Sequence, residues 1–148
     1  MSRPDPLNTV LKLAVDAEEQ AALQLRSAQL DCQKRQNQLD ALNNYRLDYM
    51  KQMDDQVGKN ISASQYHQFH RFIKQIDQAI TQQLGVVKEA DVQRGYRQQH
   101  WMEKQQRRKA VELLLASKAE KALAVENKRE QKMTDEFASQ QYYRKNQR

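Results

Sequence analysis

Residues 57–65 read VGKNISASQ, and this stretch decides the fold because a helix stop stands beside a helix start. Gly58 is one of only three glycines, and glycine commonly takes the left-handed conformation just beyond a helix end. Ser62 and Gln65 have the spacing of a capping box, which satisfies free backbone N–H groups at a helix start. The two signals lie about four residues apart, the connection length of an antiparallel helical hairpin. The alternative is a kink in one continuous helix, and the coincidence of stop and start favours the hairpin.

The residues before this turn predict one long helix, from about residue 6 to about residue 56. Asp5 is a strong N-cap residue, and Pro6 is favoured at the first helical position. A seven-residue repeat then runs to the turn, which is the pattern of a coiled coil. One column of the repeat comprises Leu7, Ala14, Ala21, Ala28, Arg35, Leu42 and Tyr49, and a second comprises Leu11, Glu18, Leu25, Cys32, Leu39, Arg46 and Met53.

The turn is expected at about residues 57–62. The residues after it predict a second helix from about residue 63 to about residue 140, with a frayed C-terminus. Phe72 and Ala79 lie about 100° round this helix from Ile73 and Ile80. Either a broad seam buries both pairs, or one pair forms an exposed apolar ridge. We favour the ridge, because a two-stranded coil turns only a narrow stripe inward. The repeat has one column of Phe69, Ile76, Gln83 and Ala90, and another of Ile73, Ile80, Val87, Arg94, Trp101, Arg108, Leu115 and Ala122.

Folding about residue 60 places residue i opposite about residue 120 − i, so residues beyond about 116 lack a partner in the first helix. The predicted fold is all-α: a single domain over residues 1–148, built as a long antiparallel two-helix coiled-coil hairpin whose second helix overhangs. Apolar residues on an unpaired helix meet another molecule, or the helix frays. Both outcomes stay open for residues 117–135, and fraying is expected beyond them.

Composition agrees with a thin core. The chain has 148 residues, of which 39% are hydrophobic, and its mean hydropathy is −1.04. Such a polar chain suits a coiled coil, where only a stripe is buried. The net charge of +6 is concentrated in residues 91–110 and 128–148. Such basic segments are most often a solvated helix face, and the alternative is a contact with an acidic partner. Candidate contacts with a partner molecule are Arg94, Arg97, Trp101, Arg107, Arg108, Val125, Met133 and Phe137.

The same basic segment allows a second hypothesis, a nucleic-acid-binding helix. Tyr96 and Trp101 are of the type that stacks on bases. No DNA- or RNA-binding motif accompanies them, so we expect no nucleic-acid partner.

No enzymatic site is recognisable in the sequence. His67 and His70 are three residues apart, but no acidic or cysteine ligand set accompanies them. Phosphate loops and hydrolase motifs are absent. Cys32 is the only cysteine and is expected to be a small core residue. We expect no enzyme, no metal and no cofactor.

We expect a cytoplasmic location. The first six residues lack the apolar region of a signal peptide, and no apolar run approaches the roughly 20 residues of a membrane span.

Short motifs, read in order, resemble the flagellar type III export protein family FliJ. They are the Cys32-Gln33 pair, Gln38-Leu39, Leu42 with Tyr45 and Tyr49, GKNIS at 58–62, QFHRFI at 68–73, Ala79-Ile80, ENK at 126–128 and QKMTDEFA at 131–138. The resemblance covers nearly the whole chain, and the order and spacing of the motifs make it specific.

The resemblance implies a non-enzymatic component of the type III protein-transport apparatus that builds the bacterial flagellum and so supports motility. Such a coiled coil is similar to the central stalk of rotary ATPases. It inserts its terminal end into the hexameric export ATPase and promotes assembly of the ring. It also binds the cytoplasmic domain of the export gate, which couples energy to export, and escorts export substrate chaperones. Its location is then peripheral, at the cytoplasmic face of the inner membrane.

The resemblance also implies site residues. The export-gate contact carries over to Phe72, Ile76, Ala79 and Gln83, where the family pattern has leucine at the second position and histidine at the fourth. Family positions on the first helix are Gln38, Leu42, Tyr45 and Tyr49. The chief alternative is a generic coiled-coil adaptor or the stalk of a virulence type III secretion system.

Overall fold

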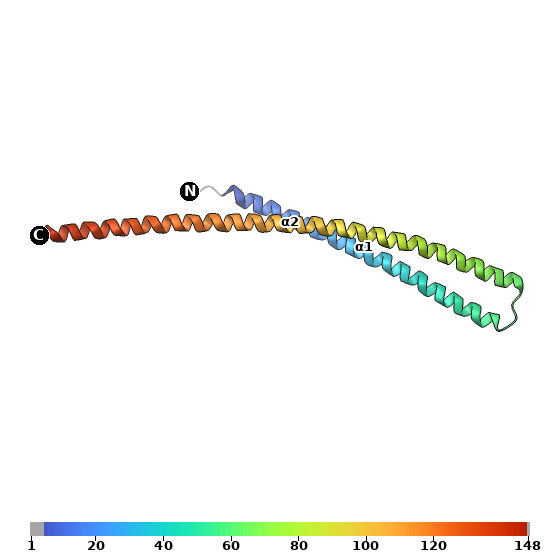
Figure 1. The fold of residues 1–148 in the computed structure, drawn as a ribbon. Helices are drawn as coiled ribbons and strands as arrows, with labels where there is room; N and C mark the ends of the chain where they lie inside the picture. Colours follow the sequence, from blue (N-terminus) through green and yellow to red (C-terminus); the bar gives the residue numbers. More distant parts are fainter. Residues whose placement is uncertain (1–4, 148) are drawn as a thin grey trace. The chain divides into compact units, whose positions relative to one another are not determined.

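The computed structural model describes residues 5–147 and consists of two long helices (Figure 1). Helix α1 (Pro6–Val57) has 52 residues and helix α2 (Ala63–Asn146) has 84. No strand occurs among the residues described, so the predicted all-α hairpin is confirmed. Residues 1–4, on which part of the signal-peptide argument rests, and residue 148 lie outside this range.

The predicted N-cap begins α1. The Asp5 side chain accepts a hydrogen bond from the backbone N–H of Leu7 at 2.9 Å, and its carbonyl accepts one from Asn8 at 3.0 Å. The first free N–H groups of the helix are thereby satisfied. Lys118 of α2 also contacts the Asp5 carboxylate, with Nζ 2.7 Å from Oδ2.

The turn contains the predicted capping box. The backbone N–H of Gln65 donates to Ser62 Oγ at 3.2 Å, and the backbone N–H of Ser62 donates to Gln65 Oε1 at 3.3 Å. The prediction of a left-handed Gly58 is wrong, because Asn60 has the positive φ, 57°. Gly58 instead continues the helical pattern, its N–H directed to the carbonyl of Asp54 at 3.4 Å. Asparagine tolerates the left-handed region better than most residues, so the left-handed residue lies two positions later than expected.

The heptad columns form the seam between the helices. Both α1 columns are buried or half-buried at every position, with Ala14 only 5% exposed. In α2 the predicted columns are covered as far as Leu115, whereas Ala122 is exposed. Few apolar side chains in the seam are fully buried, and several of these are small. They are Ala14, Ala21, Leu39, Met53, Ile73, Ile76, Ala90 and Val111.

The chain divides into two compact units, and each helix passes through both. The first unit combines residues up to Glu18 with residues from Lys104 onward, and the second spans Glu19–Glu103. In the second unit the two helices run antiparallel and are joined by the turn (Figure 1). Arg46 and Asp77 pair across its seam at 2.6 Å, and their numbers sum to 123, close to the expected 120.

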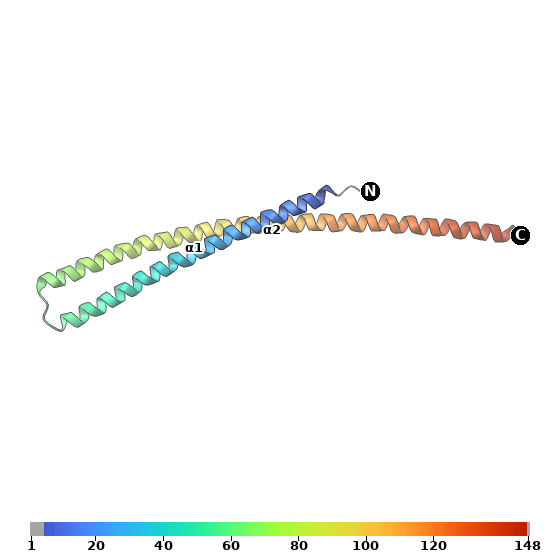
Figure 2. The same ribbon diagram turned by 180° about the vertical axis from the view of Figure 1, so that it is seen from behind.

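In the first unit, α2 continues well past the beginning of α1 (Figure 2). The Lys118–Asp5 pair lies at the start of α1, and every described residue of α2 from 116 onward is exposed. We call residues 119–146 the overhang. Its presence was predicted, but it remains helical to Asn146, six residues beyond the expected end. Arg144 and Lys145 in its last turn favour this extension, because positive charge offsets the partial negative charge of a helix C-terminus.

Whether both units behave as one cooperative domain stays a prediction. Over residues 5–147, neither helix contains a stretch apolar and long enough to cross a bilayer.

Candidate protein-binding surfaces

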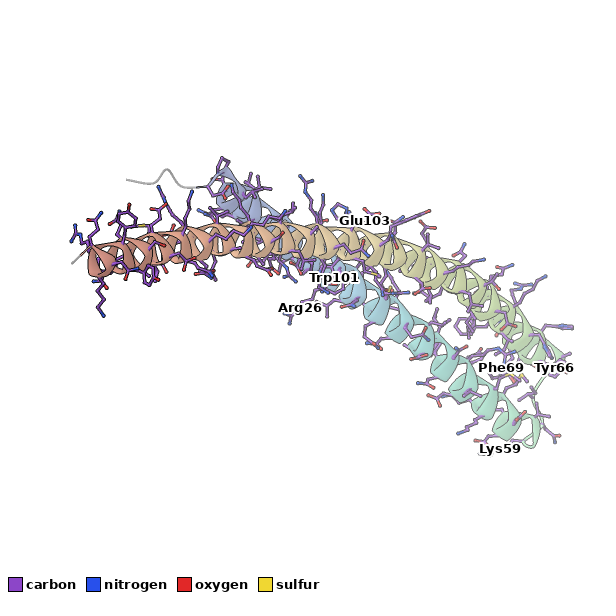
Figure 3. The ribbon with its side chains drawn as sticks, turned by 60° about the vertical axis from the view of Figure 1, so that its left-hand side comes forward. Arg26, Lys59, Tyr66, Phe69, Trp101 and Glu103 are labelled. Carbon is purple, nitrogen blue, oxygen red and sulfur yellow. The ribbon has the colours of Figure 1, made fainter. Side chains whose placement is uncertain are left out.

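Aromatic side chains from both helices meet near the turn. The ring of Tyr49 lies 4.5 Å from that of Phe72 and 5.2 Å from that of Phe69, centroid to centroid (Figure 3 labels Phe69). Tyr45 approaches Phe72 edge-on at 6.1 Å. Tyr45 itself remains 51% exposed. This aromatic cluster, comprising Tyr45, Tyr49, Phe69 and Phe72, therefore exposes one amphipathic ring to solvent, while its other members pack in the seam.

The predicted gate contact is less exposed than the ridge hypothesis requires. Ile76 is buried at 5% exposure, and Phe72 and Ala79 are half-buried. Ile73 is also buried, and Ile80 half-buried, so both edges of the α2 stripe pack into one broad seam. The exposed ridge that we favoured is not found. The bulky rings of the aromatic cluster widen the contact between the helices, and a wider seam covers both edges.

Gln83 joins the predicted gate residues to the predicted site residues on α1. Its side-chain amide donates to the backbone carbonyl of Arg35 at 2.9 Å and to Gln38 Oε1 at 3.3 Å. Tyr45 and Tyr49 contact Phe72 as described above, and Leu42 is half-buried in the same seam. The structure thus brings the two sets of predicted residues onto one part of the hairpin.

Several predicted basic contacts are occupied within the chain. Arg97 Nη1 donates to Gln24 of α1 at 3.1 Å. Arg94 donates to Asp91 at 3.0 Å and to Gln98 at 2.7 Å. Trp101 is half-buried, which leaves little of its face for stacking on bases. These contacts weaken the nucleic-acid hypothesis, because both arginines already have hydrogen-bond partners within the chain.

Arg108 has the strongest set of internal partners. Its guanidinium donates to both carboxylate oxygens of Glu18, and through Nη1 to the carboxylate of Glu112 at 2.9 and 3.0 Å. The side chains of Arg108 and Glu18 are only 23% and 16% exposed. The two carboxylates raise the pKa of Arg108, Glu18 contributing most. Arg108 therefore belongs to the seam, whereas the adjacent Arg107 is exposed.

A shallow groove in the first unit was not predicted. It is lined by Val10, Leu13, Ala14, Ala17, Lys104 and Arg107. Leu13 is 63% exposed, so the groove offers apolar surface beside two positive charges. Only the register between α1 and α2 brings these residues together, and no local sequence signal marks them.

The predicted overhang residues remain open to solvent. Val125, Met133 and Phe137 are each more than 60% exposed. Met133 and Phe137 line one shallow surface depression with Thr134, Glu136 and Gln140. Within residues 5–147, no cluster of three or more histidine, cysteine or acidic side chains is placed to hold a metal ion. The absence of enzymatic activity stays a prediction.

Comparison with known proteins identifies the family. Residues 2–147 match the family described as "Flagellar FliJ protein". A curated relative from Escherichia coli (strain K12), called "Flagellar FliJ protein", is 29% identical over 145 residues, covering 98% of this chain and 99% of the relative. A relative of the same name from Salmonella typhi is 28% identical over the same length and with the same coverage. The end-to-end match, on a helical hairpin with the expected turn and seam, shows that the chain belongs to the flagellar FliJ family.

Proposed function

We propose that this chain, a flagellar export component by family, is a non-enzymatic stalk that links a hexameric export ATPase to the export gate. The observation that carries the proposal is the family match over residues 2–147. The paired helices supply the stiffness that a stalk requires, and exposed surfaces in each unit offer separate contacts.

The first unit is the proposed ATPase contact. It carries the overhang, with apolar side chains that no residue of the described chain covers, and the groove between α1 and α2. Lys104 and Arg107 give that groove a positive rim, which suits an acidic surface of the ring. Insertion of this end promotes ring assembly by giving the subunits a common surface to pack against.

The second unit is the proposed contact for the gate's cytoplasmic domain. Tyr45 and the half-exposed edges of Phe72 and Ala79 supply the accessible surface. Ile76 is buried beneath them, so we assign it a positioning role instead of a direct contact. Gln83 holds the same surface to α1 through Gln38. We propose that chaperones of export substrates bind this half as well, and that the gate holds the protein at the cytoplasmic face of the inner membrane.

Paired variants test the two contacts separately. Tyr45→Ala should weaken binding of the purified full-length chain to the gate domain, while binding to the ATPase is unchanged. Arg107→Glu should weaken ATPase binding and leave gate binding unchanged. Arg108→Glu is unsuitable because it disrupts the contact with Glu18. Leu84→Ala, at a residue 51% exposed in the second unit but outside the aromatic cluster, is the matched control.

The assignment of surfaces is wrong if Tyr45→Ala spares gate binding while Arg107→Glu abolishes it. Affinity capture from lysate of a flagellated cell, followed by mass spectrometry, separates the flagellar proposal from the alternatives. Recovery of the flagellar export ATPase supports it, and recovery of a virulence-type ATPase or of neither contradicts it.

A further inference from the structure

The overhang continues the face of α2 that packs on α1. Val111 lies in the seam, and Ala122 and Met133 follow it at intervals of 11 residues. Leu115, Glu126 and Phe137 repeat the same interval. Eleven residues make slightly more than three helical turns, so residues at this spacing return to within about 20° on a straight helix. One nearly straight stripe therefore runs from the seam onto the overhang, where α1 no longer covers it.

This exposed stripe is complementary to itself. Its N-terminal half carries the small residues Ala119 and Ala122, and its C-terminal half carries the bulky Met133 and Phe137. We propose that two copies of the chain pair antiparallel through their overhangs. In that arrangement Phe137 of one copy packs on Ala119 of the other, and Met133 packs on Ala122. Large side chains then meet small ones across the contact, as in well-packed helix interfaces.

Charge favours the same alignment. In an antiparallel pair of identical helices, the numbers of facing residues have a nearly constant sum. The sum is 256 for Ala119 and Phe137 and 255 for Ala122 and Met133. It is also 255 for Glu126 of one copy and Arg129 of the other, which have opposite charges. One antiparallel alignment thus satisfies all three, and two-fold symmetry repeats each of them. A parallel pairing would set Glu126 against Glu126 and Phe137 against Phe137, leaving Ala119 and Ala122 across a gap. The stripe therefore selects a second copy in one orientation.

Pairing extends an interface that already exists. Within one chain the stripe ends its contact with α1 near the Lys118–Asp5 pair, and the second copy continues it from there. The proposed ATPase contact uses the same overhang, so self-pairing and insertion into the ring exclude each other. The dimer is then the form of the free protein, and it separates when the ring binds.

The first test measures self-association of the purified full-length chain, without any ATPase. Sedimentation equilibrium over about 1–200 µM, a range that includes weak homodimers, should show a reversible monomer–dimer equilibrium. Phe137→Arg should weaken it at least about tenfold, because the symmetric contact buries the new charge twice. Tyr142→Arg is the matched control: it replaces an aromatic residue 70% exposed, about 140° round the helix from Phe137, and should leave the equilibrium unchanged.

A charge exchange guards against a simple loss of helix. Glu126→Arg and Arg129→Glu should each weaken the dimer, and the double variant should restore it while helical content stays constant. A monomer at every concentration would overturn the proposal, and equal effects of Phe137→Arg and Tyr142→Arg would do so too. Neither result would touch the proposed stalk function, which is measured by ATPase and gate binding.

Disulfide cross-linking tests the orientation, in a Cys32→Ser background. A mixture of Ala122→Cys and Met133→Cys chains should give disulfide-linked pairs containing one of each. Ala122→Cys alone should give none, because in the antiparallel alignment its two copies lie about 16 Å apart along the helix axis. Efficient cross-linking of Ala122→Cys with itself would show a parallel pair and contradict the proposal.

Discussion

Glu18 and Arg108 are charged residues placed in a seam that is otherwise mostly apolar. Each is about four-fifths covered, and each satisfies the other, with Glu112 as a further acceptor. Half-buried pairs of this kind often contribute little net stability, yet the loss of one partner leaves the other without compensation. Their value lies in alignment, because only one sliding position of α1 on α2 brings them together.

We expect this pair to be non-additive. Glu18→Leu and Arg108→Met should each lower the melting temperature, because a single charge is left in the seam. The double variant should melt at or above the wild-type temperature, since two apolar residues of similar size replace the pair. Thermal denaturation followed by circular dichroism, arranged as a double-mutant cycle, measures the coupling. Additive effects of the two substitutions would contradict the contact.

Asp5 should make the start of α1 sensitive to acid. Lys118 and the backbone N–H of Leu7 lower the pKa of its carboxyl group below the ordinary value of 3.8. A lowered pKa means that the stabilisation is complete above 3.8 and is lost as the pH falls through the folded-state pKa. Asp5→Asn retains a capping side chain but cannot titrate. The stability difference between wild type and Asp5→Asn, measured by urea unfolding, should shrink below pH 3.8; a constant difference would refute it.

Single residues differ in how well the sequence predicts them. The caps at Asp5 and Ser62 were predictable because their hydrogen-bond partners lie two and three residues away. The contact between Glu18 and Arg108 was not predictable, because the two residues are 90 apart in sequence. The sequence alone does not show which of the many carboxylates of α1 faces Arg108. The bonds of Gln83 to α1 fall in the same class, spanning 45 and 48 residues.

At the scale of elements, the turn shows why the position of a reversal is harder to predict than its presence. Gly58 and Asn60 are both compatible with a left-handed conformation, and they are two residues apart. The glycine is the stronger signal in sequence, yet Asn60 takes the positive φ. The capping box at Ser62 fixes where α2 starts, and the chain between the helices reverses just before it.

Substitution of Asn60 should reveal this conformation. Asn60→Ala should destabilise the hairpin by roughly 1 kcal/mol, because a Cβ without a local hydrogen-bonding group disfavours the left-handed region. Asn60→Gly should be neutral or stabilising for the opposite reason. Urea denaturation of both variants provides the comparison, with Lys59→Ala as the neighbouring control. Equal stability of the alanine and glycine variants at position 60 would be inconsistent with the observed φ.

The helices themselves were largely predictable from periodicity. Every position of the two α1 columns is covered in the structure, even where the residue is charged, as at Arg35 and Arg46. The width of the seam was not predictable. It depends on how Phe72 packs against Tyr49, and the heptad pattern carries no information on such rotamers.

At the scale of the whole molecule, the net charge of +6 bears on how partners are approached. Ion pairs with carboxylates offset the charges of Arg94 and Arg108, so the exposed Arg107 gains importance. Charges of this kind act on encounter rates more than on the lifetime of a complex.

We expect salt to distinguish the two proposed contacts. Raising the salt concentration to about 0.5 M should slow association with the ATPase several-fold, because screening shortens the range of the basic surface. Association with the gate through the aromatic cluster should change little. Stopped-flow or surface-based kinetics with each purified partner gives both rates. Equal salt dependence for the two partners would contradict the assignment of the basic surface to the ATPase contact.

The Lys118–Asp5 pair has a consequence for how such a chain tolerates changes of length. An insertion of one residue within a paired segment rotates everything beyond it by about 100°, which turns the seam residues outward. Length changes between Asp5 and Lys118 must therefore come in whole heptads, matched on both sides of the turn. Beyond Lys118 no such matching applies within the chain. Insertions and deletions among related sequences should accordingly collect after this pair, where only an outside partner sets the register.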